Sequence, residues 1–347
     1  MKWKKRIVIW IVFSLSMQCL GLFYINNYLL ATDTKVVTKK VVEDKSEKAK
    51  TIDITVPEEA ETVLVSYDAK YLSYYEKEEL KLVNCSDGKI KNIEAEDGSK
   101  ITFSEWLPDR NRILLVEKKS DSESSNLVLY SYDVKKTEKV KVKELDWSGI
   151  SSDVENIQLS TLTGVIYIQV SNNATSSSSI YRIDRMGDTT KINTIPKLVG
   201  NIAVLRSEDK LLYEGSVYNK IYATNSDKNI SHKSISFQGA EKLTLIGAQN
   251  DEVYIGELQD NLISKIYYGK TSQDTSQWKI LDLQKASEIK DLFISSDGKA
   301  YQNDSLKGVI KEIDSGIETS YKGELSQLYT KGIVSIVDNK VSFVPFK

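Results

Sequence analysis

The chain has 347 residues, of which 28% are charged and 40% hydrophobic, and its formal net charge is −2. This length is enough to bury a large core in one or two domains. A single histidine, His232, and two cysteines, Cys19 and Cys85, exclude a Cys/His zinc cluster and leave His232 as the one histidine available as a catalytic base. Nineteen tyrosines and only four prolines favour amphipathic strands over a helical bundle.

The N-terminal residues predict a membrane anchor. Residues 1–6 contain four basic side chains and no acid, and residues 7–31 contain no charged side chain. An apolar stretch of this length predicts a transmembrane helix over residues 7–31, acting as an uncleaved signal anchor. The basic residues predict that 1–6 form a cytoplasmic tail and that the rest of the chain is extracytoplasmic, in a single-pass plasma-membrane protein. The alternative is a cleaved secretory signal, for which Leu29 is a poor fit where a small residue is wanted.

A charged linker follows the predicted anchor. Residues 32–50 carry charges of both signs and no aromatic side chain, which predicts a solvated tether. Because Cys19 falls within the predicted membrane helix, Cys85 is the only thiol of the ectodomain, and no intrachain disulfide is expected. The four basic residues of the tail are included in the net charge, so residues 7–347 carry about −6, which argues against a nucleic-acid partner.

A repeat of about 44 residues occupies positions 51–347. Its clearest member is a short, alternating hydrophobic run at 71–75, 113–117, 165–169, 210–214, 252–256, 299–303 and 333–337. One strand-like run precedes each of these, and two further runs generally follow, the last being the most polar. Four strands in a repeat of this size are typical of a β-propeller blade. The sequence therefore predicts an all-β, seven-bladed propeller, with six blades as the alternative.

The ends of this region predict how the ring closes. The seventh repeat has no fourth run after residues 341–345, and residues 51–57 form a spare run before the first repeat. We expect 51–57 to pair with 341–345, because closure leaves fewer strand edges exposed.

One turn carries a family resemblance. Trp106-Leu107-Pro108-Asp109, followed by Arg112-Ile113-Leu114-Leu115, resembles the W-x-P-D-G-x-x-[IL] repeat of TolB-like propellers, a WD40-like (PD40-type) repeat family. The same repeat occurs in the propeller domains of prolyl-oligopeptidase-type peptidases. Arg110 stands in place of the usual glycine, and residues 66–70 are a weaker copy of the turn. The resemblance implies a propeller platform and little about chemistry.

The sequence offers no catalytic constellation. It contains no Gly-x-Ser-x-Gly nucleophile turn and no D-x-D-x-D-G calcium loop, so we predict no catalytic residue, metal or cofactor. Ser216 is interpreted as a residue connecting two strands, and His232 as an edge residue of an outer strand. The alternative, a propeller glycosidase or lyase, would require carboxylates clustered at the axis with raised pKa values.

Loop lengths suggest a partner-binding face instead. The longest loops between second and third strands, 118–126 and 171–179, belong to neighbouring blades, and the blade connection 146–154 lies on the same face. The candidate partner-binding residues are Asp146, Trp147, Ser122, Asn126, Asn172 and Asn173. An aromatic side chain among adaptable Ser/Asn/Gly loops is typical of recognition surfaces. The alternative is that Trp147 packs beneath its own loop.

These observations favour one function and leave two alternatives. The preferred hypothesis is a non-catalytic, membrane-anchored extracytoplasmic propeller that acts as a protein–protein interaction scaffold in a bacterial cell-envelope or surface complex. The first alternative is a module that binds cell-wall polysaccharide or a small ligand. The second is the glycosidase or lyase, because propellers support both binding and catalysis.

Overall fold

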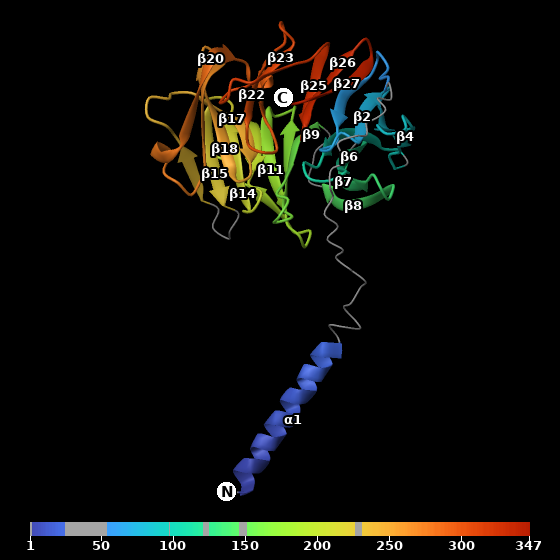
Figure 1. The fold of residues 1–347 in the computed structure, drawn as a ribbon, viewed down its shortest axis with the longest axis vertical. Helices are drawn as coiled ribbons and strands as arrows, with labels where there is room; N and C mark the ends of the chain where they lie inside the picture. Colours follow the sequence, from blue (N-terminus) through green and yellow to red (C-terminus); the bar gives the residue numbers. More distant parts are fainter. Residues whose placement is uncertain (1, 25–53, 97, 121–124, 146–150, 226–230) are drawn as a thin grey trace. The chain divides into compact units, whose positions relative to one another are not determined.

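The computed structural model describes residues 2–24, 54–96, 98–120, 125–145, 151–225 and 231–347. The chain divides into two units, Met1–Thr51 and Ile52–Lys347. The first contains one helix, α1 (Lys2–Tyr24), and the second contains the strands (Figure 1).

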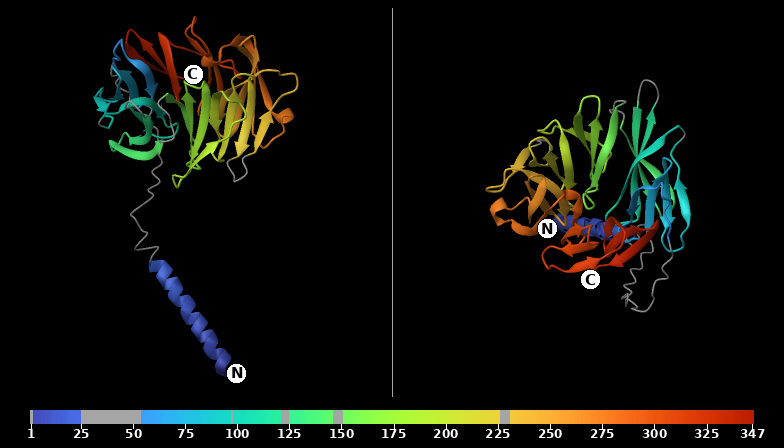
Figure 2. Two further views of the ribbon diagram at one scale, coloured as in Figure 1. Left: turned by 180° about the vertical axis from the view of Figure 1, so that it is seen from behind. Right: turned by 90° about the horizontal axis from the view of Figure 1, so that it is seen from above.

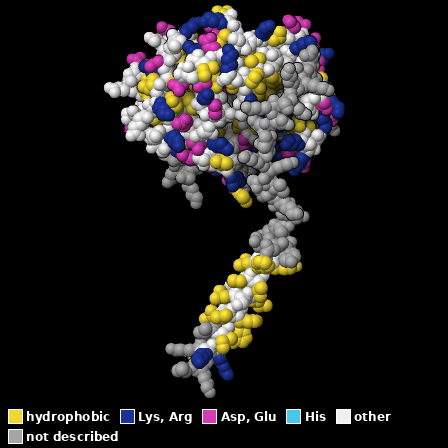
Figure 3. Space-filling view, in the orientation of Figure 1, with side chains coloured by type: hydrophobic (Ala, Val, Ile, Leu, Met, Phe, Trp, Pro, Cys, Tyr) yellow, Lys and Arg dark blue, Asp and Glu magenta, His cyan; other side chains and the backbone are white. Residues whose placement is uncertain are grey.

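Helix α1 confirms the predicted N-terminal helix with different limits. It begins at Lys2, within the basic segment, and residues 25–31 of the predicted span lie outside the described residues. Large hydrophobic side chains cover its surface from Ile9 to Tyr24 (Figure 3). Over the part of the chain that the structure describes, no helix is both long and apolar enough to cross a membrane.

The second unit consists of seven antiparallel sheets, each a meander of consecutive strands. Blade 1 contains β1 (Glu61–Val65), β2 (Tyr71–Glu76), β3 (Glu79–Asn84) and β4 (Ile90–Ile93). Blade 2 contains β5 (Lys100–Trp106), β6 (Arg112–Ser120), β7 (Ser125–Asp133) and β8 (Glu138–Leu145). Blade 3 contains β9 (Ser152–Leu159), β10 (Ile166–Asn172), β11 (Ser177–Ile183) and β12 (Thr189–Ile192). Blade 4 contains β13 (Val199–Val204), β14 (Lys210–Gly215), β15 (Lys220–Asn225) and β16 (His232–Ile235).

Blades 5 to 7 complete the series. Blade 5 contains β17 (Leu243–Gln249), β18 (Glu252–Gln259), β19 (Leu262–Gly269) and β20 (Lys279–Ser287). Blade 6 contains β21 (Leu292–Ile294), β22 (Ala300–Asp304), β23 (Val309–Glu312) and β24 (Glu318–Ser320). Blade 7 contains β25 (Glu324–Tyr329), β26 (Gly332–Val337) and β27 (Lys340–Pro345). Short 3-10 turns, η2 (Thr275–Gln277) and η3 (Ile289–Asp291), flank β20. The protein is thus a seven-bladed β-propeller, and the six-blade alternative is wrong.

The blades follow one another around a ring in chain order, so the first and last blades are neighbours (Figure 2, right). The first strand of each blade is innermost, and contacts between β1 and β25, β5 and β9, and β13 and β17 join adjacent blades there. The fourth strands β4, β12, β16 and β24 are short and mostly exposed. This exposure explains why the fourth run of each sequence repeat is the most polar.

Residues 54–56 close the ring as predicted. Thr55 bridges Lys340 in antiparallel pairing, the Val56 amide donates to the Asn339 carbonyl at 2.8 Å, and the Val341 amide donates to the Ile54 carbonyl at 2.9 Å. Asn339 belongs to a two-residue turn whose residues have φ of 49° and 63°, a conformation that Asp and Asn tolerate. Blade 7 has three strands, and the N-terminal segment takes the fourth-strand position through this isolated bridge.

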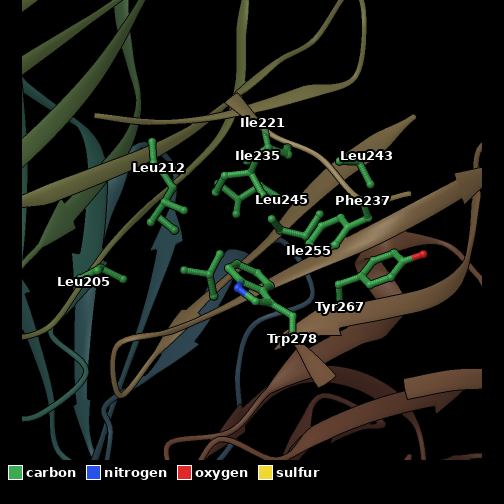
Figure 4. Close-up of a cluster of buried hydrophobic side chains, with 13 residues drawn as sticks. Leu205, Leu212, Ile221, Ile235, Phe237, Leu243, Leu245, Ile255, Tyr267 and Trp278 are labelled. Carbon is green, nitrogen blue, oxygen red and sulfur yellow. The ribbon is translucent and has the colours of Figure 1, made fainter. Parts of the chain in front are cut away.

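Hydrophobic side chains fill the boundaries between blades. Figure 4 shows one such cluster, in which Leu205 and Leu212 of blade 4 meet Leu245 and Ile255 of blade 5. Phe237 stacks on Tyr267 in the same cluster, with ring centroids 4.0 Å apart. Such contacts join each blade to its neighbours, and no disulfide is formed between Cys19 and Cys85.

Substitution at the closing segment tests how far the ring depends on it. Ile54 is 4% exposed, within a cluster that also includes Val65 and Val334 of the first and last blades. We expect Ile54→Ala to lower the free energy of unfolding by about 2–5 kcal/mol, because it removes buried methyl groups and leaves a cavity. Ile90→Ala, on the exposed strand β4, is the matched control and should change it by less than about 0.5 kcal/mol. Equal effects in urea denaturation would contradict this role of closure.

Candidate functional site

The structure places three of the predicted partner-binding residues on one face. Asn126 lies on β7 opposite Lys119, Asn172 ends β10 opposite Ser177, and Asn173 occupies the following turn. Blades 2 and 3 are neighbours through β5 and β9, so these hairpins project side by side from the same face. Asp146, Trp147 and Ser122 lie outside the described residues.

The two predicted loops differ from the observed structure because the strands continue into them. Strand β6 runs to Ser120, which pairs with Ser125, and β11 begins at Ser177. The segments 118–126 and 171–179 are therefore mostly paired hairpin arms. Backbone pairing between polar residues extends each arm without any hydrophobic alternation in the sequence.

Polar contacts join these two hairpins to each other. Lys118 Nζ of blade 2 donates to Asp153 Oδ1 at 2.6 Å and to the Ser152 carbonyl at 3.1 Å. Asn173 Nδ2 donates to Asp153 Oδ2 at 3.3 Å, so one carboxylate is shared between blades 2 and 3. The base of this surface is therefore held in place, and the side chain of Asn126 is exposed.

Blade 4 adds two residues that the sequence analysis missed. The turn between β14 and β15 carries Val217 and Tyr218, which are 61% and 76% exposed. Ser216, in the same turn, connects the two strands as predicted. Turns are normally polar, so two large hydrophobic residues between Gly215 and Asn219 were a sequence signal for an exposed binding surface. We define the hairpin face as Asn126, Asn172, Asn173, Val217 and Tyr218.

The opposite face has a pocket on the propeller axis. Because strands alternate in direction, the turns between first and second strands lie at the other end of the ring from the hairpin face. There, residues of β1, β5, β17, β21, β25 and the turns after them enclose a pocket of about 290 Å³, called here the axial pocket. Five of the seven blades contribute to it.

Glu105 is the only charged residue among the described residues that line the axial pocket. It lies on β5 between buried Ser104 and Trp106, and alternation along the strand directs it away from them. Its side chain is accessible from the pocket, but the surrounding walls limit its hydration, and this desolvation raises the pKa of Glu105 to about 7. No described residue makes a hydrogen bond or ion pair with it.

Contacts between neighbouring turns hold the rim of this face. Ser207 Oγ donates to Asp251 Oδ2 at 2.5 Å, joining blades 4 and 5. The side-chain amides of Gln249 and Asn250 donate to the Ser296 carbonyl at 3.0 and 3.1 Å, joining blades 5 and 6. Thr330 Oγ1 donates to the Tyr67 carbonyl at 2.6 Å, joining blades 7 and 1. The rim around the pocket is therefore tied at several blade boundaries.

The other residues considered for chemistry have structural surroundings. His232 begins β16, an outer strand as predicted, and its Nδ1 lies 2.8 Å from Tyr213 Oη. Burial raises the pKa of the Cys85 thiol to about 12, so the reactive thiolate is disfavoured. Trp106 and Trp278 are buried between blades, and Trp106 Nε1 donates to Ser73 Oγ at 2.9 Å.

The acidic residues show neither a metal cluster nor a catalytic pair in the axial pocket. Within the described ranges, no three His, Cys, Asp or Glu side chains converge as metal ligands. Glycoside hydrolysis generally uses two carboxylates about 5–9.5 Å apart. The lining residues that the structure describes supply one, Glu105.

Comparison with known proteins supports the fold alone. No protein-family model and no curated protein matches the chain. Virginiamycin B lyase from Staphylococcus aureus is 14% identical, with a TM-score of 0.55 over 85% of this chain and 98% of that one. An oligogalacturonate lyase in complex with manganese is 12% identical, with a TM-score of 0.58 over 82% and 90% of the two chains.

A propeller that is not named as a lyase is about as similar. The β-propeller domain of Cps50 (Swd1) from Myceliophteria thermophila is 12% identical, with a TM-score of 0.54 over 84% of this chain and 98% of that one. TolB from Acinetobacter baumannii is also matched, with 14% identity over 66% and 55% of the two chains, but its TM-score of 0.39 carries no argument. The overall fold is thus shared with proteins whose names indicate different activities.

The raised pKa of Glu105 predicts a pH-dependent stability. A carboxyl whose pKa rises on folding, here from 4.5 to about 7, keeps its proton longer in the folded chain. Its ionisation therefore lowers stability as the pH rises through that interval. We expect Glu105→Gln to leave the free energy of unfolding nearly unchanged at pH 4 and to raise it above that of the wild type at pH 8. Urea denaturation across this range, with the exposed Glu61→Gln as control, measures the difference; a constant offset at every pH would contradict it.

Proposed function

We propose that the protein is a non-catalytic, membrane-anchored extracytoplasmic propeller that serves as a protein–protein interaction scaffold in a cell-envelope or surface complex. The observation that carries this proposal is the hairpin face, where adjacent blades present Asn126, Asn172 and Asn173 beside exposed Val217 and Tyr218. A tyrosine among short polar side chains supplies contact area at low entropic cost, and this composition is common at protein interfaces.

The fixed base of the hairpin face supports this function. Asp153 accepts from both Lys118 and Asn173, so the hairpins of blades 2 and 3 are held together before any partner binds. A preorganised surface loses less conformational entropy on association. Charged side chains of both signs are interspersed over the face of the propeller visible in Figure 3, in keeping with a protein rather than a nucleic-acid partner.

The N-terminal segment supports the proposed location. Four basic residues precede the uncharged stretch 7–31, and such an asymmetry favours a cytoplasmic N-terminus. The likeness to lyases concerns fold, and Glu105 lacks the second carboxylate of a glycosidase among the described residues of its pocket. These observations favour binding over catalysis.

The interaction face is tested by capture of partners with the full-length chain crosslinked in its native membrane. Tyr218→Ser and Asn173→Ala should each reduce recovery of the same protein partner, because truncation of a central interface residue costs about 1 kcal/mol or more. Trp147, a partner-binding residue predicted from the sequence, is tested in the same way, and Trp147→Ala should also reduce recovery of the partner.

The matched control is Met186→Ser. Met186 is 85% exposed in the turn between β11 and β12, in the same blade as Asn173 but on the opposite face. Unchanged recovery by Tyr218→Ser and Asn173→Ala would exclude the hairpin face. Recovery of wall polysaccharide in place of protein would favour the polysaccharide-binding alternative.

Membrane anchoring is tested by fractionation of cells that express the full-length chain or a deletion of residues 1–31. We expect the full-length chain to sediment with membranes after alkaline carbonate extraction and the deletion to remain soluble, since it lacks the apolar segment. Mass measurement of the N-terminus distinguishes the anchor from a signal cleaved after Ala31. Full-length protein in the soluble cytoplasmic fraction would contradict both.

A further inference from the structure

Among the described residues, the axial pocket contains one charged side chain, that of Glu105, which has no role in the proposed scaffold function. Its walls are apolar at Leu64, Leu107, Ile294 and Leu328, aromatic at Tyr67, Trp106 and Tyr329, and otherwise neutral apart from Glu105. No Lys or Arg is among its described lining residues. The pocket lies at the opposite end of the ring from the hairpin face, so a ligand there would be independent of the proposed protein interface.

Glu105 is not a structural carboxylate. The two most buried acids that the structure describes, Glu117 and Glu214, are each held by more than one donor; Glu214 accepts from Thr244 Oγ1 at 2.9 Å and from the Leu245 amide at 3.0 Å. Glu105 is exposed to the pocket and has no such donor among the described residues. Its carboxylate is therefore open to a cation that enters the pocket, and the apolar walls around it strengthen such a charge pair.

We propose that the axial pocket binds a small organic cation, a primary ammonium on a short apolar stem, with the ammonium paired to Glu105 and the stem against the apolar walls. Tyr67 and Tyr329 line the same pocket, and aromatic rings attract cations. An anion is repelled by Glu105, and a neutral ligand leaves the carboxylate of the pocket without an opposite charge.

The size of the pocket limits the stem. A volume of about 290 Å³ is just below the usual range of ligand pockets, about 300–1,000 Å³. It accommodates an alkylammonium or arylalkylammonium ion and excludes a long oligosaccharide. The same ammonium group occurs in free amines and on the lysine side chain of a protein, and the experiment below distinguishes these sources.

Binding should depend on pH through Glu105. The other titratable groups that line the pocket are the hydroxyls of Tyr67 and Tyr329; burial raises the pKa of Tyr329, which keeps it neutral. Strands β9 and β13, the innermost strands of blades 3 and 4, contribute no described lining residue. An alkylammonium stays charged below about pH 10, so the pKa of Glu105 at about 7 predicts roughly tenfold tighter binding at pH 8 than at pH 6.

The experiment is isothermal titration calorimetry of the full-length chain with n-butylammonium and phenethylammonium as probes. Butyrate and 1-butanol are the matched anionic and neutral probes, and N-acetyl-lysine methylamide represents a side chain presented by a protein. We expect the ammonium probes to bind, butyrate and butanol to bind at least tenfold more weakly, and the affinity to rise from pH 6 to pH 8. Binding of the lysine derivative but not of the free amines would assign the ammonium to a protein ligand.

Substitution at the pocket completes the test. Glu105→Gln keeps the shape of the side chain and removes its charge, so it should weaken ammonium binding by about tenfold to a hundredfold and abolish the pH dependence. Glu61→Gln, at the opposite end of an innermost strand, should leave binding unchanged. Equal binding of butanol and n-butylammonium, or unchanged binding by Glu105→Gln, would overturn the proposal. Retention of the wild-type near-ultraviolet circular dichroism by Glu105→Gln ensures that lost binding is not lost folding.

Discussion

The closure between the first and last blades is the constraint on which the rest of the structure depends. Each blade packs only against its neighbours, so a ring has its full set of blade boundaries only when its ends meet. Residues 54–56 pair with β27, and Gln327 of blade 7 binds the backbone of Val65 in blade 1 through both amide atoms, at 3.1 and 3.2 Å. The axial pocket depends on this boundary, because Leu64 and Tyr67 on one side and Leu328 and Tyr329 on the other are among its walls.

The parts of the fold that sequence analysis predicted are those with a strong local signal. Alternating hydrophobic runs such as 113–117 identified the blades, and the unpaired run near residues 54–56 identified the closing strand. The hairpin arms were missed because their pairs, such as Lys119 with Asn126, are polar and leave no alternation to detect. Their length is decided by pairing with the neighbouring strand, which a single segment does not reveal.

The candidate sites were less predictable than the fold. Topology alone placed Asn126, Asn172 and Asn173 on one face, because loops of the same type share an end of a propeller. Tyr218 had a local signal but was missed, because long loops were used to predict the binding face and its turn is short. The axial pocket had no local sequence signal, because its walls come from five blades. In the sequence, nothing distinguishes Glu105 from the other acidic residues, which total 49 with it. Only the closed ring brings Leu64, Gln249 and Tyr329 into the same pocket.

A comparison among three glutamates separates structural from functional acids in this propeller. Glu117 is 1% exposed and accepts from Lys139 Nζ at 2.6 Å and the Glu96 amide at 2.9 Å, and Glu214 bridges blade 4 to the backbone and hydroxyl of blade 5. Such carboxylates join neighbouring strands or blades through hydrogen bonds, and these donors offset the free-energy cost of burying the charge. Glu105 has the same side chain on an innermost strand, but it is exposed to the axial pocket and has no described donor. It therefore takes no part in joining the blades, and its carboxylate is the charged group that the pocket offers to the proposed ammonium ligand.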